Sequence, residues 1–158
     1  MGNGQGKRGV VIGAGIVGAS LAYHLAGKGA NVTLVEAEGI ASGVTGRSFA
    51  WINTSHPEPD PIAQLRGAAI REYRRLETQL PGLKIRWTGA LSYSVMSSGA
   101  LSASGHQASA NLVSRSQILD LEPNLKNPPA SALFAAAEGA LDAVATTHAL
   151  VAGAEAHG

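Results

Sequence analysis

The sequence has 158 residues, of which 45% are hydrophobic and 15% charged, and its net charge is +1; these values fit one folded domain of ordinary size. The basic residues form no block of like charge, which argues against nucleic-acid binding. No stretch reaches the ~20 apolar residues of a membrane-spanning helix, and the first residues carry no apolar core of signal-peptide length. Cysteine is absent, which excludes disulfides, thiolate zinc sites and cysteine nucleophiles and is compatible with the cytoplasmic location that we expect.

Residues 10–36 carry the pattern of a dinucleotide-binding unit. An apolar run at residues 10–12 predicts a buried parallel strand, and Gly13, Gly15 and Gly18 follow it at the GxGxxG spacing. In such a pattern the first glycine makes a tight turn, the second lets the backbone approach a pyrophosphate, and the third lets the helix pack closely on the strand. The sequence therefore predicts a turn that directs a helix N-terminus toward a phosphate.

The predicted helix runs from Ile16 to about Lys28. The backbone N–H groups of its first turn, which have no partner within the helix, and the positive end of its dipole would bind an anion without any charged side chain. We therefore count Ile16 and Val17, together with the three glycines, as candidate cofactor-binding residues.

An acid closes the unit. Residues 32–35 predict a second strand that ends at Glu36, about 20 positions after Gly13, where an acid hydrogen-bonds an adenosine ribose in folds of this kind. The alternative is an ordinary strand–turn–helix whose glycines only relieve crowding, but it does not require a second strand and an acid at this spacing. The pattern serves FAD and NAD equally, so both cofactors stay open at this point.

Beyond Glu36 the sequence predicts a long loop and further elements. Residues 37–60 form an irregular stretch rich in Gly, Ser and Pro, and a loop of this length is usually functional. Residues 60–80 predict a helix with an Asp-Pro start and one apolar face. Residues 83–95 alternate in the manner of one or two strands, with Gly89 as a turn or bulge.

The C-terminal part of the sequence contains two helix-capping signals. Residues 97–111 are low in complexity, and a weak helix and a loop both stay open there. Ser114 and Gln117 match a capping box before a short helix. The sequence then predicts, in order, a strand at residues 132–136, a turn at Glu138-Gly139 and a helix over residues 144–155 with Asp142 as its N-cap.

Several segments resemble one protein family. The glycine fingerprint, the strand end VTLVE and the following ASGVTGRSFAWIN are similar to the N-terminus of FAD-dependent oxidoreductases of the D-amino-acid oxidase type, which include glycine oxidase, sarcosine oxidase and D-amino-acid dehydrogenases. The phrases LEPNL and EGALDAVATTHAL also resemble that family, with Ala143 in place of its usual proline. The resemblance, in particular at residues 42–48, favours FAD over NAD.

The resemblance also implies which loop residues line the cofactor, namely Thr45, Gly46, Arg47 and Ser48. Without it, a solvated loop arginine explains Arg47 equally well. Some relatives attach the flavin covalently through a His in this segment or a Cys further on, but residues 45–50 (TGRSFA) contain no His and the chain has no Cys. We therefore expect non-covalent FAD. No residue stands out as a catalytic acid or base, and we expect no metal site.

The fold that the resemblance implies is α/β, a Rossmann-like FAD-binding domain with the start of an incomplete mixed-sheet substrate domain. Residues 1–81 would be the first part of the FAD-binding domain, residues 82–141 the start of the substrate domain, and residues 142–158 a helix that returns to the FAD-binding domain. Because family members are more than twice as long, we expect the chain to be the front portion of such an enzyme.

The implied activity is oxidation of the CH–N bond of a small amine or amino acid, with hydride transfer to flavin N5 and hydrolysis of the imine. We expect the 158 residues by themselves to be inactive. Two alternatives stay open, an NAD-binding dehydrogenase and a non-catalytic nucleotide-binding fragment. The sequence indicates neither the particular amine nor the oligomeric state.

Overall fold

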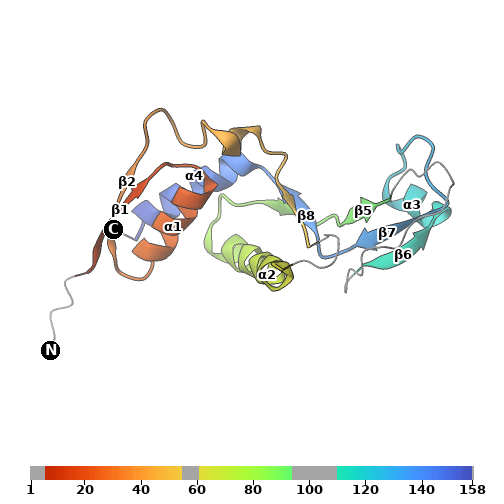
Figure 1. The fold of residues 1–158 in the computed structure, drawn as a ribbon, viewed down its shortest axis with the longest axis horizontal. Coiled ribbons are helices and arrows are strands. Elements are labelled where there is room, and N and C mark those ends of the chain that lie inside the picture. Colours follow the sequence, from red (N-terminus) through yellow and green to blue (C-terminus); the bar gives the residue numbers. More distant parts are fainter. Residues whose placement is uncertain (1–5, 55–60, 94–109, 158) are drawn as a thin grey trace. The chain divides into compact units, whose positions relative to one another are not determined.

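The computed structural model describes residues 6–54, 61–93 and 110–157 (Figure 1). Its elements, in chain order, are β1 (Arg8–Ile12), α1 (Ile16–Ala26), β2 (Asn31–Val35), the 3₁₀ helix η1 (Val44–Arg47), β3 (Trp51–Ile52), α2 (Ala63–Gln79), β4 (Ile85–Arg86), β5 (Ala90–Ser92), β6 (Asn111–Ser114), α3 (Arg115–Leu121), β7 (Ser131–Ala135), β8 (Gly139–Leu141) and α4 (Ala143–Glu155).

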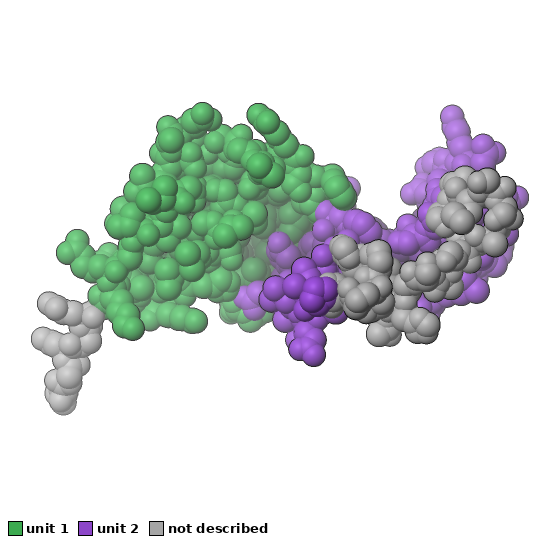
Figure 2. Space-filling model, viewed as in Figure 1, with its two compact units in different colours: residues 1–50, 74–85, 141–158 green, residues 51–73, 86–140 purple. Residues whose placement is uncertain are grey.

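The chain divides into two compact units, which Figure 2 colours separately. The first unit comprises residues 1–50, 74–85 and 141–158, and the second comprises residues 51–73 and 86–140. The assignment of residues 1–81 and 142–158 to FAD binding and of residues 82–141 to substrate binding is a statement about function, and it stays a prediction.

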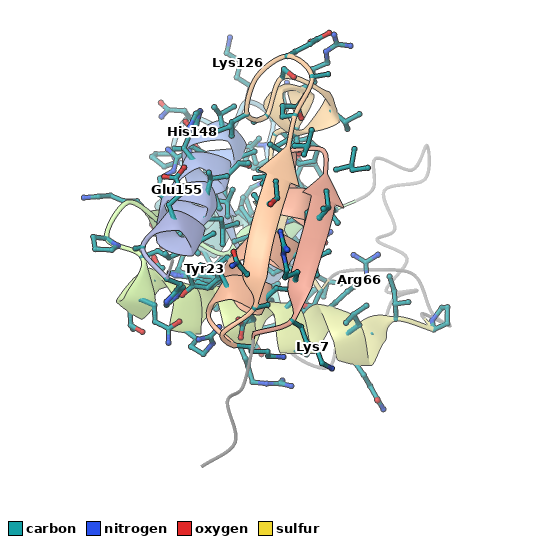
Figure 3. All side chains as sticks on the ribbon, turned by 90° about the vertical axis from the view of Figure 1, so that its left-hand side faces the viewer. Lys7, Tyr23, Arg66, Lys126, His148 and Glu155 are labelled. Carbon is teal, nitrogen blue, oxygen red and sulfur yellow. The ribbon has the colours of Figure 1, made fainter. Side chains whose placement is uncertain are left out.

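The first unit is built on the parallel pair β1 and β2, which stand side by side in Figure 3. α1 connects the two strands, as a parallel pair requires a crossover. Successive side chains of β1 alternate between the faces of the pair. Val11 is buried, whereas Val10 and Ile12 are 67% and 86% exposed. One face of the pair is therefore covered within the unit, and the other presents apolar side chains.

α4 packs along α1, and small side chains allow the close approach. Ala19 and Ala22 of α1 are buried. A Cβ atom on Gly153 of α4 would lie 2.6 Å from Leu80 Cδ2 and 2.9 Å from Tyr23 Cε2. The core of this unit thus consists of alanine, glycine and a few larger side chains, in keeping with the low aromatic content of the sequence.

Among the described residues, most of two three-stranded sheets belongs to the second unit, and the strand orders are β3-β8-β4 and β5-β7-β6. β7 pairs antiparallel with both neighbours, and β8 pairs antiparallel with β3. A small core joins the second sheet to α3: Val113, Ile118 and Ala132 are buried, and Leu91 and Phe134 pack against them. This core holds the β6–α3 turn on the sheet.

Most of the predicted elements are confirmed. The strands expected at residues 10–12, 32–35 and 132–136 and the helices expected at residues 16–28, 60–80 and 144–155 all form, with ends that differ by at most about three residues, which is the usual uncertainty of element boundaries. The capping box of Ser114 and Gln117 and the N-cap at Asp142 are both present. Asp60, the predicted cap of α2, and residues 97–109 lie outside the described residues.

Three short strands differ from the expectations. The turn expected at Glu138-Gly139 lies two residues earlier, at residues 136–137, where the Glu138 N–H donates to the Ala135 carbonyl oxygen at 3.2 Å, and Gly139 already begins β8. A Cβ atom on Gly139 would lie 2.5 Å from the Arg86 carbonyl oxygen, so the glycine lets β8 lie close to β4. β3 falls in the stretch that we expected to be irregular, and β6 was not predicted. These strands are two to four residues long and depend on their neighbours, which a local sequence pattern does not encode.

Candidate cofactor site

The turn between β1 and α1 requires its glycines. Gly13 has φ +96°, a conformation that glycine adopts without strain, and its N–H donates to the Val35 carbonyl oxygen at 2.7 Å. A Cβ atom on Gly18 would lie 1.9 Å from the Gly13 carbonyl oxygen, so only glycine lets α1 begin so near the strand. The turn is therefore tied to the end of β2 and packed directly under the helix.

The N-terminus of α1 is formed by backbone rather than by a capping side chain of its own. Gly15 is the N-cap and makes no side-chain cap, and the first turn holds no acid. The Ala19 N–H donates to the Gly15 carbonyl oxygen at 2.9 Å. The N–H groups of Val17 and Gly18 precede this bond and have no carbonyl one turn earlier to accept them. They form an anion site of the kind found at helix N-termini.

Thr45 reaches this helix end from the following loop. Its Oγ1 accepts the N–H of Ile16 at 3.0 Å, and a Cβ atom on Gly15 would lie 3.1 Å from the same oxygen. The glycine therefore leaves a space beside the helix N-terminus that any side chain would fill. This space and the backbone donors around it fit the pyrophosphate of a dinucleotide.

Glu36 holds the glycine turn as well as offering an acceptor. Its Oε2 accepts the Ala14 N–H at 2.7 Å, and its Oε1 accepts the N–H groups of Ala37 and Glu38 at 2.8 and 3.0 Å. These bonds lower the pKa of Glu36 from its ordinary value of 4.5. The bond from the Ala14 N–H lowers it most, followed by the bond from the Glu38 N–H. The ionised carboxylate keeps acceptor capacity beyond three bonds, so a ribose hydroxyl can bind beside a turn that the same group positions.

The loop from residue 41 to residue 50 is built back onto the turn. The Ala41 N–H donates to the Ala14 carbonyl oxygen at 3.0 Å. A Cβ atom on Gly46 would lie 2.6 Å from the Ala41 carbonyl oxygen, so the glycine closes the loop. Ala41 and Ala50, at its two ends, have φ +62° and +52°, which is uncommon for residues other than glycine. Such conformations persist only where surrounding contacts determine them.

The structure brings together the predicted residues Gly13, Gly15, Ile16, Gly18, Glu36 and Thr45 through these contacts. Val17 contributes its backbone, since its side chain is 80% exposed. Arg47 is exposed on the loop, and the Ser48 Oγ accepts the Ala50 N–H at 3.0 Å. That these residues contact a cofactor stays a prediction.

Sequence reasoning missed four residues of this region. Ala14 and Ala41 act through backbone N–H and carbonyl groups, which leave no signal in the sequence. Val44 and Phe49 are 86% and 82% exposed on the loop. Two large apolar residues within a Gly/Ser-rich loop are the signal that could have identified them.

A cavity of about 600 Å³ adjoins the site. It is lined by β2, α1 and α4, with Glu36 and Ile40 among its walls and Glu155, labelled in Figure 3, on the α4 side. Apart from Glu36, Glu155 and Thr33, its walls are aliphatic side chains, including Val32, Leu34 and Val151. Among the helices of the described ranges, none is long and apolar enough to cross a membrane.

Comparison with known proteins shows the same fold in solved structures of oxidases and dehydrogenases. Glycine oxidase from Bacillus cereus ATCC 14579 superposes with a TM-score of 0.79 at 17% identity, over 98% of this chain and 45% of that chain. L-proline dehydrogenase from P. horikoshii gives a TM-score of 0.80 at 21% identity, over 97% and 42% of the two chains. L-alpha-glycerophosphate oxidase from Mycoplasma pneumoniae, solved with FAD bound, gives 0.76 at 17% identity, over 96% and 42%. The chain thus spans less than half the length of these structures.

The sequence comparisons point the same way. The 4-methylaminobutanoate oxidase (formaldehyde-forming) of Paenarthrobacter nicotinovorans is 35% identical over 88 residues, which are 56% of this chain and 11% of that protein. The model of the family described as FAD dependent oxidoreductase (DAO) matches residues 9–158. The expected α/β, Rossmann-like fold is confirmed by the solved structures, and the choice between FAD and NAD is decided for FAD by the family. The chain therefore belongs to the family of FAD dependent oxidoreductases.

Proposed function

We propose that this chain is the FAD-binding front portion of an enzyme that oxidises the CH–N bond of a small amine or amino acid. The observation that carries the proposal is the helix N-terminus at Gly15, where backbone N–H groups and Thr45 surround a space that a Cβ atom would fill. The ionised Glu36 lies at the same turn. Donors for an anion beside an acceptor for a hydroxyl are what a pyrophosphate and its ribose require.

The loop after Glu36 would hold the flavin end of the cofactor. Thr45 is already directed to the helix N-terminus by its bond from Ile16, and the next residues, Gly46, Arg47 and Ser48, continue away from that point along the chain. The exposed side chains of Val44 and Phe49 offer apolar surface that a planar ring would cover. Arg47 would supply positive charge beside the phosphates or the ring.

Bound FAD supplies the hydride acceptor for the oxidation of the amine carbon, which leaves an imine that water hydrolyses. The residues described here bind and orient: the first turn of α1 holds the anion, and Glu36 holds the ribose and the turn. Support for a nitrogen-bearing substrate comes from relatives named glycine oxidase, L-proline dehydrogenase and 4-methylaminobutanoate oxidase. We further propose that the cofactor is non-covalent, because residues 45–50 lack His and the chain lacks Cys.

FAD titration of the 158-residue chain tests the cofactor site. Gly15→Val is expected to abolish FAD binding because the side chain fills the pyrophosphate space, while far-ultraviolet circular dichroism stays unchanged. Gly9→Val is the matched control, since a Cβ atom there meets nothing within 4 Å and valine suits a strand. Equal FAD retention by the wild type and Gly15→Val would refute the proposed site. After denaturation, free FAD in the supernatant is expected.

A second titration tests the ribose contact, and turnover tests the activity. Glu36→Ala is expected to weaken FAD binding severalfold, and Glu38→Ala, an exposed acid two residues further on, is expected to leave it unchanged.

With glycine, sarcosine and D-amino acids, we expect no hydrogen peroxide formation or dye reduction by the 158 residues alone, because they span 45% of the glycine oxidase chain. Robust turnover of an amine would contradict the front-portion proposal, and turnover confined to non-amines would contradict the substrate class.

A further inference from the structure

Glu138 is a buried carboxylate in the second unit, far from the glycine turn in sequence. Its side chain is 0% exposed. Oε2 accepts the Trp51 Nε1–H at 3.1 Å, and Oε1 accepts both the Thr54 N–H at 2.7 Å and the Thr54 hydroxyl at 3.1 Å. Its own carbonyl oxygen accepts the Gly89 N–H at 2.9 Å. Glu138 thus accepts hydrogen bonds from two separate segments of the chain, from residues 51–54 through its side chain and from Gly89 through its backbone carbonyl.

Three hydrogen bonds to the carboxylate come from residues 51–54, a segment with little regular structure of its own. β3 is two residues long, pairing Trp51 with Ala140 and Ile52 with Gly139. A strand pairing of only two residues does little to fix the register between β3 and β8. The three bonds to Glu138 attach Trp51, in β3, and Thr54, two residues beyond the end of that strand.

This segment follows directly on the proposed cofactor loop. Ala50, the last residue of that loop, has φ +52°, and its carbonyl oxygen accepts the Leu141 N–H at 3.3 Å. A left-handed alanine persists only where its flanks are fixed, and the flank on its C-terminal side is the segment that Glu138 holds. The course of the chain out of the cofactor loop therefore depends on a carboxylate 87 residues away from Trp51.

We propose that Glu138 is a positioning residue that fixes residues 51–54 and, through them, the exit of the cofactor loop, so that the loop binds FAD in one conformation. The effect on FAD rests on the proposed function; the attachment of residues 51–54 does not. The chemistry explains why the residue is a carboxylate. Its Oε2 accepts from Trp51 and its Oε1 from Thr54, whereas glutamine would place an NH₂ group against one of these donors.

The test combines two substitutions, of which the second removes the donor–donor conflict that the first creates. In Glu138→Gln, Oε1 can still accept both Thr54 donors, but the amide NH₂ opposes the Trp51 Nε1–H. Trp51→Phe removes that N–H, so the double variant relieves the conflict. Glu122→Gln, an exposed glutamate of the same unit that accepts the Asn124 N–H at 3.3 Å, is the matched control.

The first readout is the indole N–H resonance in ¹⁵N-labelled protein without FAD. Glu138→Gln is expected to move the Trp51 resonance, whereas Glu122→Gln is expected to leave it in place. An unmoved Trp51 resonance would overturn the proposal. Far-ultraviolet circular dichroism of the same variant, expected to match the wild type, separates this specific attachment from general loosening of the fold.

The second readout is the double-mutant cycle. The unfolding constant of the double variant is expected to be about tenfold smaller than the product of the two single effects predicts, as for residues in direct contact. Strict additivity would overturn the proposal. If Glu138→Gln is largely unfolded, the cycle can still be interpreted as long as Trp51→Phe folds. The double variant then either recovers folding, as the proposal expects, or stays unfolded, which would refute the pairing.

The third readout is FAD affinity, measured on the folded variants. Glu138→Gln is expected to lower the affinity about fivefold, and Trp51→Phe in the same chain is expected to restore most of it. Unchanged affinity in Glu138→Gln would overturn the role in the cofactor loop. If the wild type binds no FAD, the proposed function fails, and the resonance and the cycle still decide whether Glu138 holds residues 51–54.

Discussion

The glycine turn of the first unit and the short sheets of the second unit are held together in different ways. At the turn the contacts are made mostly by backbone groups, and the residues there are small. Gly13 has a positive φ, and a Cβ atom on Gly15 or Gly18 would lie close to a neighbouring oxygen. In the second unit the contacts are made by buried side chains, such as Ile118 in the small core and Glu138 under β3. A substitution at the turn therefore acts by what it adds, and one in the sheets by what it removes.

The largest effect is expected from an addition at the turn. Gly18→Val places a Cβ atom 1.9 Å from the Gly13 carbonyl oxygen, where both partners belong to the backbone. Overpacking usually costs about 1–3 kcal/mol and occasionally more, and we expect a loss of stability above this range because neither backbone partner can turn aside. Urea unfolding followed by circular dichroism measures it. Gly39→Val, at a position where a Cβ atom meets nothing within 4 Å, is the control, and equal midpoints would contradict the expectation.

A removal in the second unit is expected to reach a similar size by the opposite mechanism. Ile118 is 0% exposed, and truncating such a residue to alanine costs about 2–5 kcal/mol. Unlike Gly18→Val, Ile118→Ala is expected to leave the FAD affinity of the folded protein unchanged. Leu119→Ala, its neighbour at 39% exposure, is expected to cost much less. Equal losses for the two variants would show that the small core does not carry the stability of this unit.

A third comparison uses the same kind of helix cap in each unit. The Asp142 Oδ1 accepts the Ala145 N–H at 2.9 Å at the start of α4, whereas the Ser114 Oγ accepts the Gln117 N–H at 3.5 Å at the start of α3. Asp142→Ala is expected to lower stability by about 1 kcal/mol, and Ser114→Ala by less, since its bond is longer and carries no charge. Denaturant midpoints of the two variants measure the difference. A larger effect for Ser114→Ala would reverse the ranking.

The smallest effect is expected from a change of charge at the turn, and it depends on pH. Because backbone bonds lower the pKa of Glu36 in the folded state below 4.5, its ionised form stabilises the folded protein at neutral pH. This contribution is lost as the pH falls through the lowered pKa. The urea midpoint of the wild type should therefore exceed that of Glu36→Gln at pH 7 and approach it in strongly acidic buffer. A difference that does not vary with pH would show that the charge is not what holds the turn.

The sequence by itself determined the parts of the site that depend on local spacing. The strand, the three glycines, the helix and the acid lie within residues 10–36, where each element follows from a period or an offset in the chain. The need for glycine is likewise local at Gly13, whose φ is +96°. The capping box at Ser114 and the N-cap at Asp142 were predictable for the same reason, since each bond spans three residues.

Only the tertiary structure decided which distant groups meet. Thr45 accepts the N–H of a residue 29 positions earlier, and Glu138 accepts that of Trp51, 87 positions earlier. The donors at Ile16 and Ala14 are backbone N–H groups, which almost every residue possesses, so no residue type marks them in advance. β3 and β8 likewise form because each finds a partner strand, and the free energy of such pairing comes from contacts across the sheet rather than from the local sequence.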